Sequence, residues 1–223
     1  EPPPPVEPPV NVGATLTISD AMIEEGSNAV FDVTLSNASD AAFDVTFTAA
    51  VLDGNTAETA DFDATSLVVT YLDGGSETAL TVNADGSFTI PAGVTALTVK
   101  VPTLDDDIYE SAETFTLSAS TEDAAYTTTD TGVGTIMDDG TEDDGDDADS
   151  TPDDDRPSFS IADVSVDEDA GTITFTVTKT GATEFASSVD YNVVEGEALE
   201  PEDYGVDDPL SGTLNFAAGV TEQ

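Results

Sequence analysis

Acidic side chains recur along one short stretch of the chain at a spacing that could hold a metal ion. The stretch DDDIYESAETF begins at Asp105 and carries its acidic residues at positions 105, 106, 107, 110 and 113. A second acidic pair, Asp138 and Asp139, ends the segment GVGTIMDD about two dozen residues later. The chain contains neither Cys nor His, which excludes disulfides, thiolate and imidazole catalysis, and the usual zinc sites. Oxygen ligands remain, and these are the ligands that calcium prefers.

The charge of the chain points in the same direction. Its 223 residues include 48 acidic residues against three basic ones, Lys100, Arg156 and Lys179, so that the formal net charge is -45. Such a chain repels nucleic acid and anionic membrane surfaces and attracts cations. No apolar stretch approaches the roughly 20 residues that span a bilayer. We therefore expect calcium ions as partners, no nucleic acid and no direct membrane insertion.

The elements that must position these residues are strands. Apolar residues alternate with polar ones at period two, as in Phe31, Val33 and Leu35, and no long helical periodicity competes. Many short strands separated by turn signals predict an all-β fold, an antiparallel immunoglobulin-like β-sandwich. The second half repeats the pattern, because VDEDAGTITFTVTKTG resembles IEEGSNAVFDVTLSNA and SGTLNFAAGVT resembles GSFTIPAGVT.

We predict four parts along the chain. Residues 1–12 form a proline-rich linker, which indicates a piece of a longer protein, and residues 13–140 form a complete sandwich with an inserted β-hairpin at about 64–86. Residues 141–157 form an acidic, flexible linker. Residues 158–223 form a second sandwich that stops before its closing strands.

Strand parity predicts that the acidic loops of the first sandwich meet. Successive antiparallel strands place their connections at alternating ends. The turn with Glu24, the loop with Asp61, the stretch after Asp105 and the pair at Asp138 then share one end. The turn Asn83–Gly86 is expected at that end too. Carboxylates gathered within a few ångströms repel one another by several kcal/mol at an intermediate dielectric, so a cation is expected between them.

These motifs resemble the Calx-beta domain. The resemblance rests on DDDIYESAETF, on GVGTIMDD, on a Glu before the second strand, on the pair Asp61 and Phe62, and on the PAGV turn, and it covers essentially the whole first block. It implies a cluster of several calcium ions whose ligands are Glu24, Asp61, Asp105, Asp106, Glu110, Glu113, Asp138 and Asp139. Asp107 stays open as a ligand or a residue beside one. The family often ends in three acidic residues, whereas Gly140 stands at the third position here, which puts one calcium ion in doubt.

The second block resembles the same domain over a shorter length. Glu168 and Asp203 match the first two ligand positions, and no DDD-x-x-E-x-x-E stretch follows before Gln223. We expect this partial second site to bind calcium poorly.

The chain resembles the tandem repeats of large type I-secreted (RTX-like) bacterial adhesins in three features: its proline-rich start, its high content of Thr and Asp, and its lack of Cys. The resemblance implies an extracellular, calcium-stiffened spacer that supports cell adhesion or biofilm attachment. Its partners would be neighbouring tandem domains and a host or surface ligand bound elsewhere in the protein. Two alternatives stay open: a tip domain that binds carbohydrate or protein, and a regulatory calcium sensor of a membrane protein. An enzyme is not expected, because the carboxylates crowd at one end of a sandwich that offers no Trp and no His.

Overall fold

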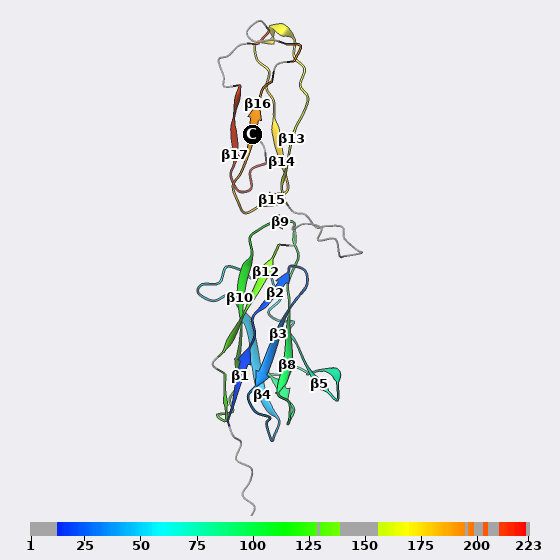
Figure 1. Ribbon diagram of the computed structural model, residues 1–223, viewed down its shortest axis with the longest axis vertical. Helices are drawn as coiled ribbons and strands as arrows, with labels where there is room; N and C mark the ends of the chain where they lie inside the picture. The colour runs from blue at the N-terminus through cyan, green and yellow to red at the C-terminus, as the bar shows by residue number, and fades with distance from the viewer. Residues whose placement is uncertain are drawn as a thin grey trace, which may run out of the picture. The chain divides into compact units, whose positions relative to one another are not determined.

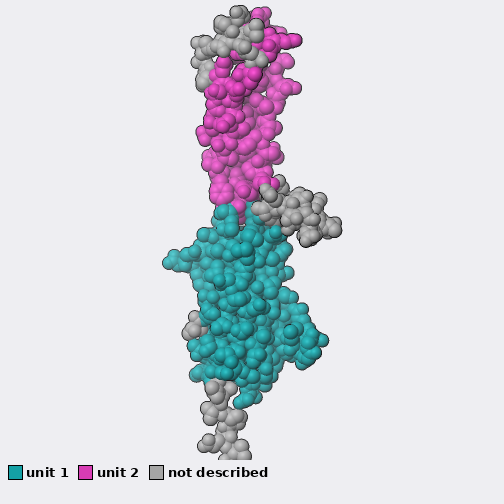
Figure 2. All heavy atoms as spheres, in the orientation of Figure 1, with its two compact units in different colours: residues 1–106, 111–138 teal, residues 107–110, 139–223 magenta. Residues whose placement is uncertain are grey.

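The computed structural model describes residues 13–128, 130–138, 156–194, 196–198, 203–204 and 210–221. Asp139, residues 1–12 and residues 141–155 of the predicted acidic linker lie outside them. The chain divides into two compact units, coloured teal and magenta in Figure 2. The first comprises Glu1–Asp106 and Ser111–Asp138, and the second comprises Asp107–Glu110 and Asp139–Gln223.

The first unit is a two-sheet β-sandwich, and Figure 1 labels most of its strands. One sheet has the order β11 (Tyr126–Thr127), β1 (Ala14–Ile18), β3 (Asn28–Leu35), β8 (Ala96–Pro102), β5 (Val68–Asp73) and β6 (Ser76–Ala79). The other has the order β2 (Ala21–Glu24), β12 (Thr131–Met137), β10 (Glu113–Ser120), β4 (Phe43–Ala50) and β7 (Phe88–Ile90). Most pairings are antiparallel, and β1–β11 and β2–β12 are parallel. The predicted all-β sandwich is the fold of this unit.

The alternating sequence explains how the two sheets make one core. Every second residue of β3 is buried, so that Phe31, Val33 and Leu35 point inward while Asp32 and Thr34 face solvent. The inner faces of both sheets contribute to one cluster of buried side chains, which includes Leu16, Ile90, Val99, Phe115 and Leu117. Strands are thus held by burial of one face, as a period of two requires.

The segment predicted to be an insertion contains a hairpin. Strands β5 and β6 pair antiparallel from Thr70↔Ala79 to Asp73↔Ser76. Gly74 and Gly75 form the turn with φ of 57° and 92°, and a two-residue hairpin turn with both φ angles positive favours glycine. β5 also pairs with β8, so the hairpin extends the six-stranded sheet.

The turn Asn83–Gly86 does not lie where parity placed it. β7 is only three residues long and pairs with the start of β4, at Phe43↔Ile90. The amide of Asn83 accordingly donates to Thr89 Oγ1 (3.1 Å) and Asp44 Oδ1 (3.5 Å). Asp44 lies near the beginning of β4, whereas the loop to the acidic end follows the end of that strand. The expectation was wrong because the chain after the hairpin returns to the start of β4.

The second unit contains short paired strands. β13 (Ser158–Ile161) pairs with β14 (Val177–Thr180), β16 (Ser187–Asn192) pairs with β17 (Ser211–Phe216), and β15 (Ala182–Thr183) pairs with β9 (Ile108–Tyr109). A 3-10 helix, η1, covers Glu168–Ala170. Within the described ranges no helix is long and apolar enough to cross a bilayer.

One backbone hydrogen bond of the first unit recurs at the matching position of the second. The Leu35 N–H donates to the Thr95 C=O at 2.8 Å, and the Lys179 N–H donates to the Thr221 C=O at 2.7 Å. The two bonds join matching positions of the sequence repeat, since Thr95 and Thr221 both end an A-G-V-T turn. The repeat seen in the sequence is therefore a repeat of local structure.

Apolar residues of the second unit are more exposed than their counterparts. Phe31 is fully buried in the first unit, whereas Phe175, at the matching position, is 48% exposed. Apolar residues alternate with Thr at Ile173, Phe175 and Val177, but the strand begins only at Val177. Phe31 packs edge-on against Phe115 of β10, with ring centroids 5.8 Å apart. Among the described residues of the second unit, no strand plays the part of β10, so Phe175 lacks a comparable contact.

Lys179 occupies a core position in the second unit. It matches Leu35, pairs with Phe159 of β13 and is only 2% exposed. Its Nζ has no hydrogen-bond partner among the described residues. A buried amine without a partner is unfavourable, because it has lost its hydration without replacing it.

Replacing Lys179 with Leu is expected to stabilise the second unit by about 1–3 kcal/mol, the usual penalty of an unsatisfied buried polar group. Hydrogen exchange of the β13 and β14 amides should become slower. Lys100→Leu serves as the control, because the amine of Lys100 bonds to Glu77 at 2.9 Å and its removal gains nothing. Exchange as fast in Lys179→Leu as in the parent chain would show that the amine is satisfied.

Candidate metal centre

Backbone pairing brings the predicted acidic regions to one end of the first sandwich. Glu24 ends β2 beside Met137, the last residue of β12, and the Glu25 N–H donates to the Met137 C=O at 2.9 Å. The Leu104 N–H donates to the Asp61 C=O at 2.8 Å, immediately before the DDD stretch. Four separate chain regions therefore converge, as strand parity predicts.

Three of the predicted ligands lie close enough to share one ion. Asp61, Glu110 and Glu113 each offer a carboxylate oxygen, and these oxygens lie within 4.8 Å of one another. All three residues are half-buried. Among the described residues this is the one group of three or more acidic side chains with that geometry.

The group fits calcium on its donor set and its spacing. Ca²⁺ binds oxygen ligands at about 2.3–2.6 Å, so two oxygens on one ion lie at most about 5 Å apart. A separation within 4.8 Å satisfies that limit. The lone basic residue of residues 13–138 is Lys100, and it bonds to Glu77 on the hairpin. A cation is thus the natural means of balancing three neighbouring carboxylates.

The other predicted ligands that the structure describes are not members of this three-carboxylate group, and they differ in exposure. Glu24, Asp105 and Asp106 are exposed, and Asp107, which was left open, is exposed as well. Asp138 is half-buried at the end of β12, and Asp139 lies outside the described residues. In the second unit both Glu168 and Asp203 are exposed, and neither belongs to the three-carboxylate group. Their roles as ligands stay predictions.

A glycine lets the turn after Glu24 approach the DDD stretch. Gly26 has φ of 72°, and a Cβ built on it would lie 3.1 Å from the Asp105 Cβ. Any larger residue at position 26 would be strained by this φ and would push against Asp105. The turn and the DDD stretch are therefore held side by side by backbone geometry.

Thr103 is a positioning residue that sequence reasoning missed. Its hydroxyl donates to the Ser27 C=O at 3.0 Å, and its N–H bonds to the same carbonyl at 2.8 Å. The side chain is 4% exposed. It ties the turn that follows Glu24 to the end of β8, just before the acidic stretch. In the sequence, the only sign of this role is a Thr directly after the residues of β8. Nothing in the sequence distinguishes it from the other threonines of this Thr-rich chain.

Asp63, two residues from Asp61, is committed to its own turn. Its Oδ1 accepts hydrogen bonds from the Thr65 N–H (2.8 Å) and the Thr65 hydroxyl (2.6 Å). The hydrogen bond from the Ser66 side chain, followed by those from Thr65, lowers the pKa of Asp63 from 3.8 to about 2. The side chain is thus an ionised turn residue whose bonding is local.

Comparison with protein families decides which family this chain belongs to. The model of the Calx-beta domain matches residues 82–140 and 152–223, which together make up more than half of the chain. The chain belongs to the Calx-beta domain family. Calx-beta domains are non-catalytic modules that bind Ca²⁺. The two matches show that this chain carries the Calx-beta domain in tandem.

The matches among solved structures include domains of CALX proteins and a bacterial cohesin. CBD12 from CALX1.2 matches at 16% identity and a TM-score of 0.41, covering 94% of this chain and 72% of that one. The apo-form Calx CBD1 domain matches at 15% identity and a TM-score of 0.40, covering 57% and 98%. The sixth cohesin of scaffoldin B from Acetivibrio cellulolyticus matches at 16% identity and a TM-score of 0.27, covering 56% and 99%. No curated protein matches the sequence.

Proposed function

We propose that this chain is a calcium-binding structural spacer of a large extracellular bacterial adhesin. The observation that supports calcium binding most directly is the group of Asp61, Glu110 and Glu113, with carboxylate oxygens within 4.8 Å of one another. In this proposal Glu24, Asp105, Asp106, Asp138 and Asp139 complete the coordination of further calcium ions around that group.

Calcium would act on this module by stabilising its fold. The three carboxylates come from two parts of the chain, since Asp61 follows β4 by several residues while Glu113 begins β10. An ion bound by both cross-links these parts in the native state only. Binding of that kind stabilises the native state by RT ln(1 + [Ca]/Kd). In a chain without Cys, calcium can take the role that disulfides have in other secreted domains.

The calcium site can be tested by titration of the full chain in a calorimeter. Glu113→Gln and Asp61→Asn are expected to weaken calcium binding by about tenfold or more, which corresponds to about 1.4 kcal/mol. Glu122→Gln and Asp40→Asn are matched controls, because both residues are exposed on loops outside the carboxylate group. Equal affinities in all four variants would refute this site.

The adhesin role and the extracellular location rest on the sequence style and on the lack of Cys. Antibodies raised against this chain should label intact cells of the producing bacterium. A spacer should also fail to bind a glycan array, whereas a carbohydrate-binding tip would retain specific glycans. Labelling only after the cells are permeabilised would contradict the extracellular proposal.

A further inference from the structure

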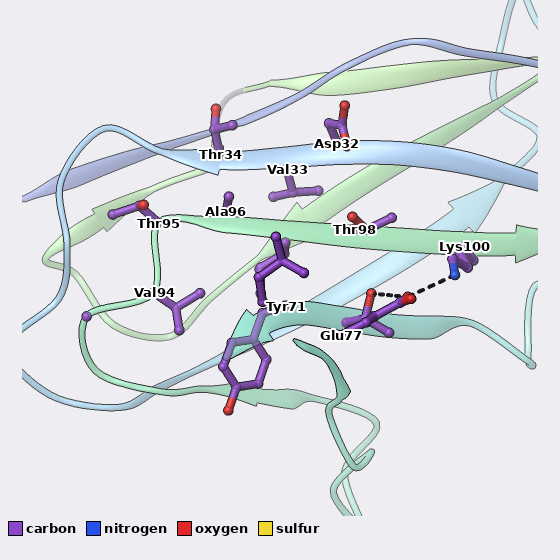
Figure 3. Close-up of a pocket in the computed structure, with 14 residues that line it drawn as sticks. Asp32, Val33, Thr34, Tyr71, Glu77, Val94, Thr95, Ala96, Thr98 and Lys100 are labelled. Atoms are coloured by element: carbon purple, nitrogen blue, oxygen red, sulfur yellow. Dashed lines mark hydrogen bonds and ion pairs between the residues drawn. The ribbon is translucent and has the colours of Figure 1, made fainter. Parts of the chain in front are cut away.

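The hairpin β5–β6 and the strand β8 diverge and leave a groove between them. β8 pairs with β3 as far as Thr34↔Ala96, whereas its ladder with β5 ends at Thr70↔Thr98. Past Thr70, β5 pairs only with β6, as far as Asp73. The six-stranded sheet therefore forks, and a groove of about 740 Å³ lies at the fork (Figure 3).

Backbone groups of both strands face this fork. The Thr95 C=O accepts a bond of 2.8 Å from the end of β3, so the next residue, Ala96, directs its N–H and C=O toward the β5 side. The Val69 C=O accepts a bond of 2.8 Å from the chain just after β6. By the same alternation, the backbone groups of Leu72 point toward β8. Ala96 and Leu72 would be the next pair of the ladder, but the strands have separated.

The side chains of the groove give it an acidic character. Asp32 and Glu77 both line it, against the single ammonium of Lys100. Lys100 Nζ lies 2.9 Å from Glu77 Oε1, as the dashed line in Figure 3 marks. Two carboxylates thus face one ammonium, in a chain with a formal charge of -45. A ligand with a positive charge is favoured here.

We propose that this groove binds a short extended peptide that carries a basic side chain, inserted as a strand between β5 and β8. The peptide would bond to the Ala96 backbone on one side and to the Leu72 backbone on the other, as in recognition by strand addition. Its basic side chain would lie toward Asp32. A saccharide could reach the hydroxyls of Thr34 and Thr98, but it would not satisfy strand-like backbone groups on both walls. The peptide is therefore the better fit.

The probe is the peptide acetyl-Thr-Val-Lys-Val-Thr-amide, added to the full, isotope-labelled chain and followed by NMR. The backbone amides of Ala96 and Leu72 are expected to shift on titration. The control peptide acetyl-Thr-Pro-Lys-Pro-Thr-amide keeps the charge but lacks two backbone N–H groups, so it should bind at least about tenfold more weakly. Equal shifts with both peptides, or no shift at Ala96 and Leu72, would overturn the proposal.

Variants of the chain test the two interactions separately. Ala96→Pro removes the N–H that faces the fork without removing one that bonds to β3, and it should lower the affinity about tenfold, whereas Ala96→Ser should not. Asp32→Asn should weaken binding several-fold and reduce its dependence on salt, while Asp40→Asn, on an exposed loop, should change neither. Binding of array glycans that Ala96→Pro abolishes would assign the groove to saccharides and overturn the peptide proposal.

Discussion

Calcium is expected to raise the melting temperature of the first unit strongly, and a chelator is expected to reverse the rise. At calcium about a hundredfold above Kd, a single bound ion contributes about 2.7 kcal/mol to the free energy of unfolding. A change of 1 kcal/mol moves the melting temperature of domains of this size range by roughly 2–8 °C. The expected rise is therefore on the order of 5–20 °C, and it grows with every further ion that the acidic end binds. Thermal unfolding followed by circular dichroism measures it.

The double variant Asp106→Ala with Glu113→Ala should lose this calcium effect. Glu113 belongs to the three-carboxylate group, and Asp106 stands in the DDD stretch that leads to it. A chain with this net charge is also stabilised by any cation through screening, so magnesium and sodium at equal ionic strength serve as controls. A melting temperature that is the same in calcium and in chelator would contradict the calcium site and mean that the acidic loops are solvated surface.

The fold of the first unit was accessible from sequence because burial alternates residue by residue in strands such as β1 and β3. In β3 the sequence pattern and the burial pattern coincide residue by residue, from the exposed Asn28 to the buried Leu35. Strand parity then sufficed to bring Glu24, Asp61 and Asp138 toward one end, because parity depends on the number of strands and not on their exact limits. This level of topology can be predicted without knowing which side chains contact one another.

Features that depend on which residues contact one another could not be predicted from the sequence. The turn Asn83–Gly86 was misplaced because the sequence does not show which end of β4 the short β7 pairs with. The tie made by Thr103 depends on a carbonyl of Ser27, 76 positions earlier in the chain. The exposure of Phe175 has the same origin, since burial needs a covering strand as well as an apolar residue. An apolar period of two shows which face of a strand is apolar, but it does not show which other strand packs on that face.

Phe115 connects the core to the carboxylate group, and its loss is expected to impair both. The residue is fully buried two positions after Glu113, and its ring stacks on that of Phe62 with centroids 4.5 Å apart. Phe62 directly follows Asp61, so one aromatic contact sets the separation of two ligand-bearing segments. Replacing a buried Phe by Ala costs about 3–5 kcal/mol. Phe115→Ala should therefore lower the free energy of unfolding by that amount and also weaken calcium binding.

Phe47→Ala provides the matched control for this prediction. Phe47 is 4% exposed and packs on Phe88 at 6.2 Å, in the same core, but it adjoins neither Asp61 nor Glu113 in sequence. Its loss should destabilise the unit comparably while leaving calcium affinity intact at temperatures where the variant is folded. Phe115→Leu, which keeps most of the buried volume, replaces Phe115→Ala if the latter does not fold. An equal loss of calcium affinity in the Phe47 and Phe115 variants would mean that calcium affinity depends on the stability of the whole sandwich. A loss confined to Phe115 would mean that the stacked pair of Phe62 and Phe115 positions the ligands.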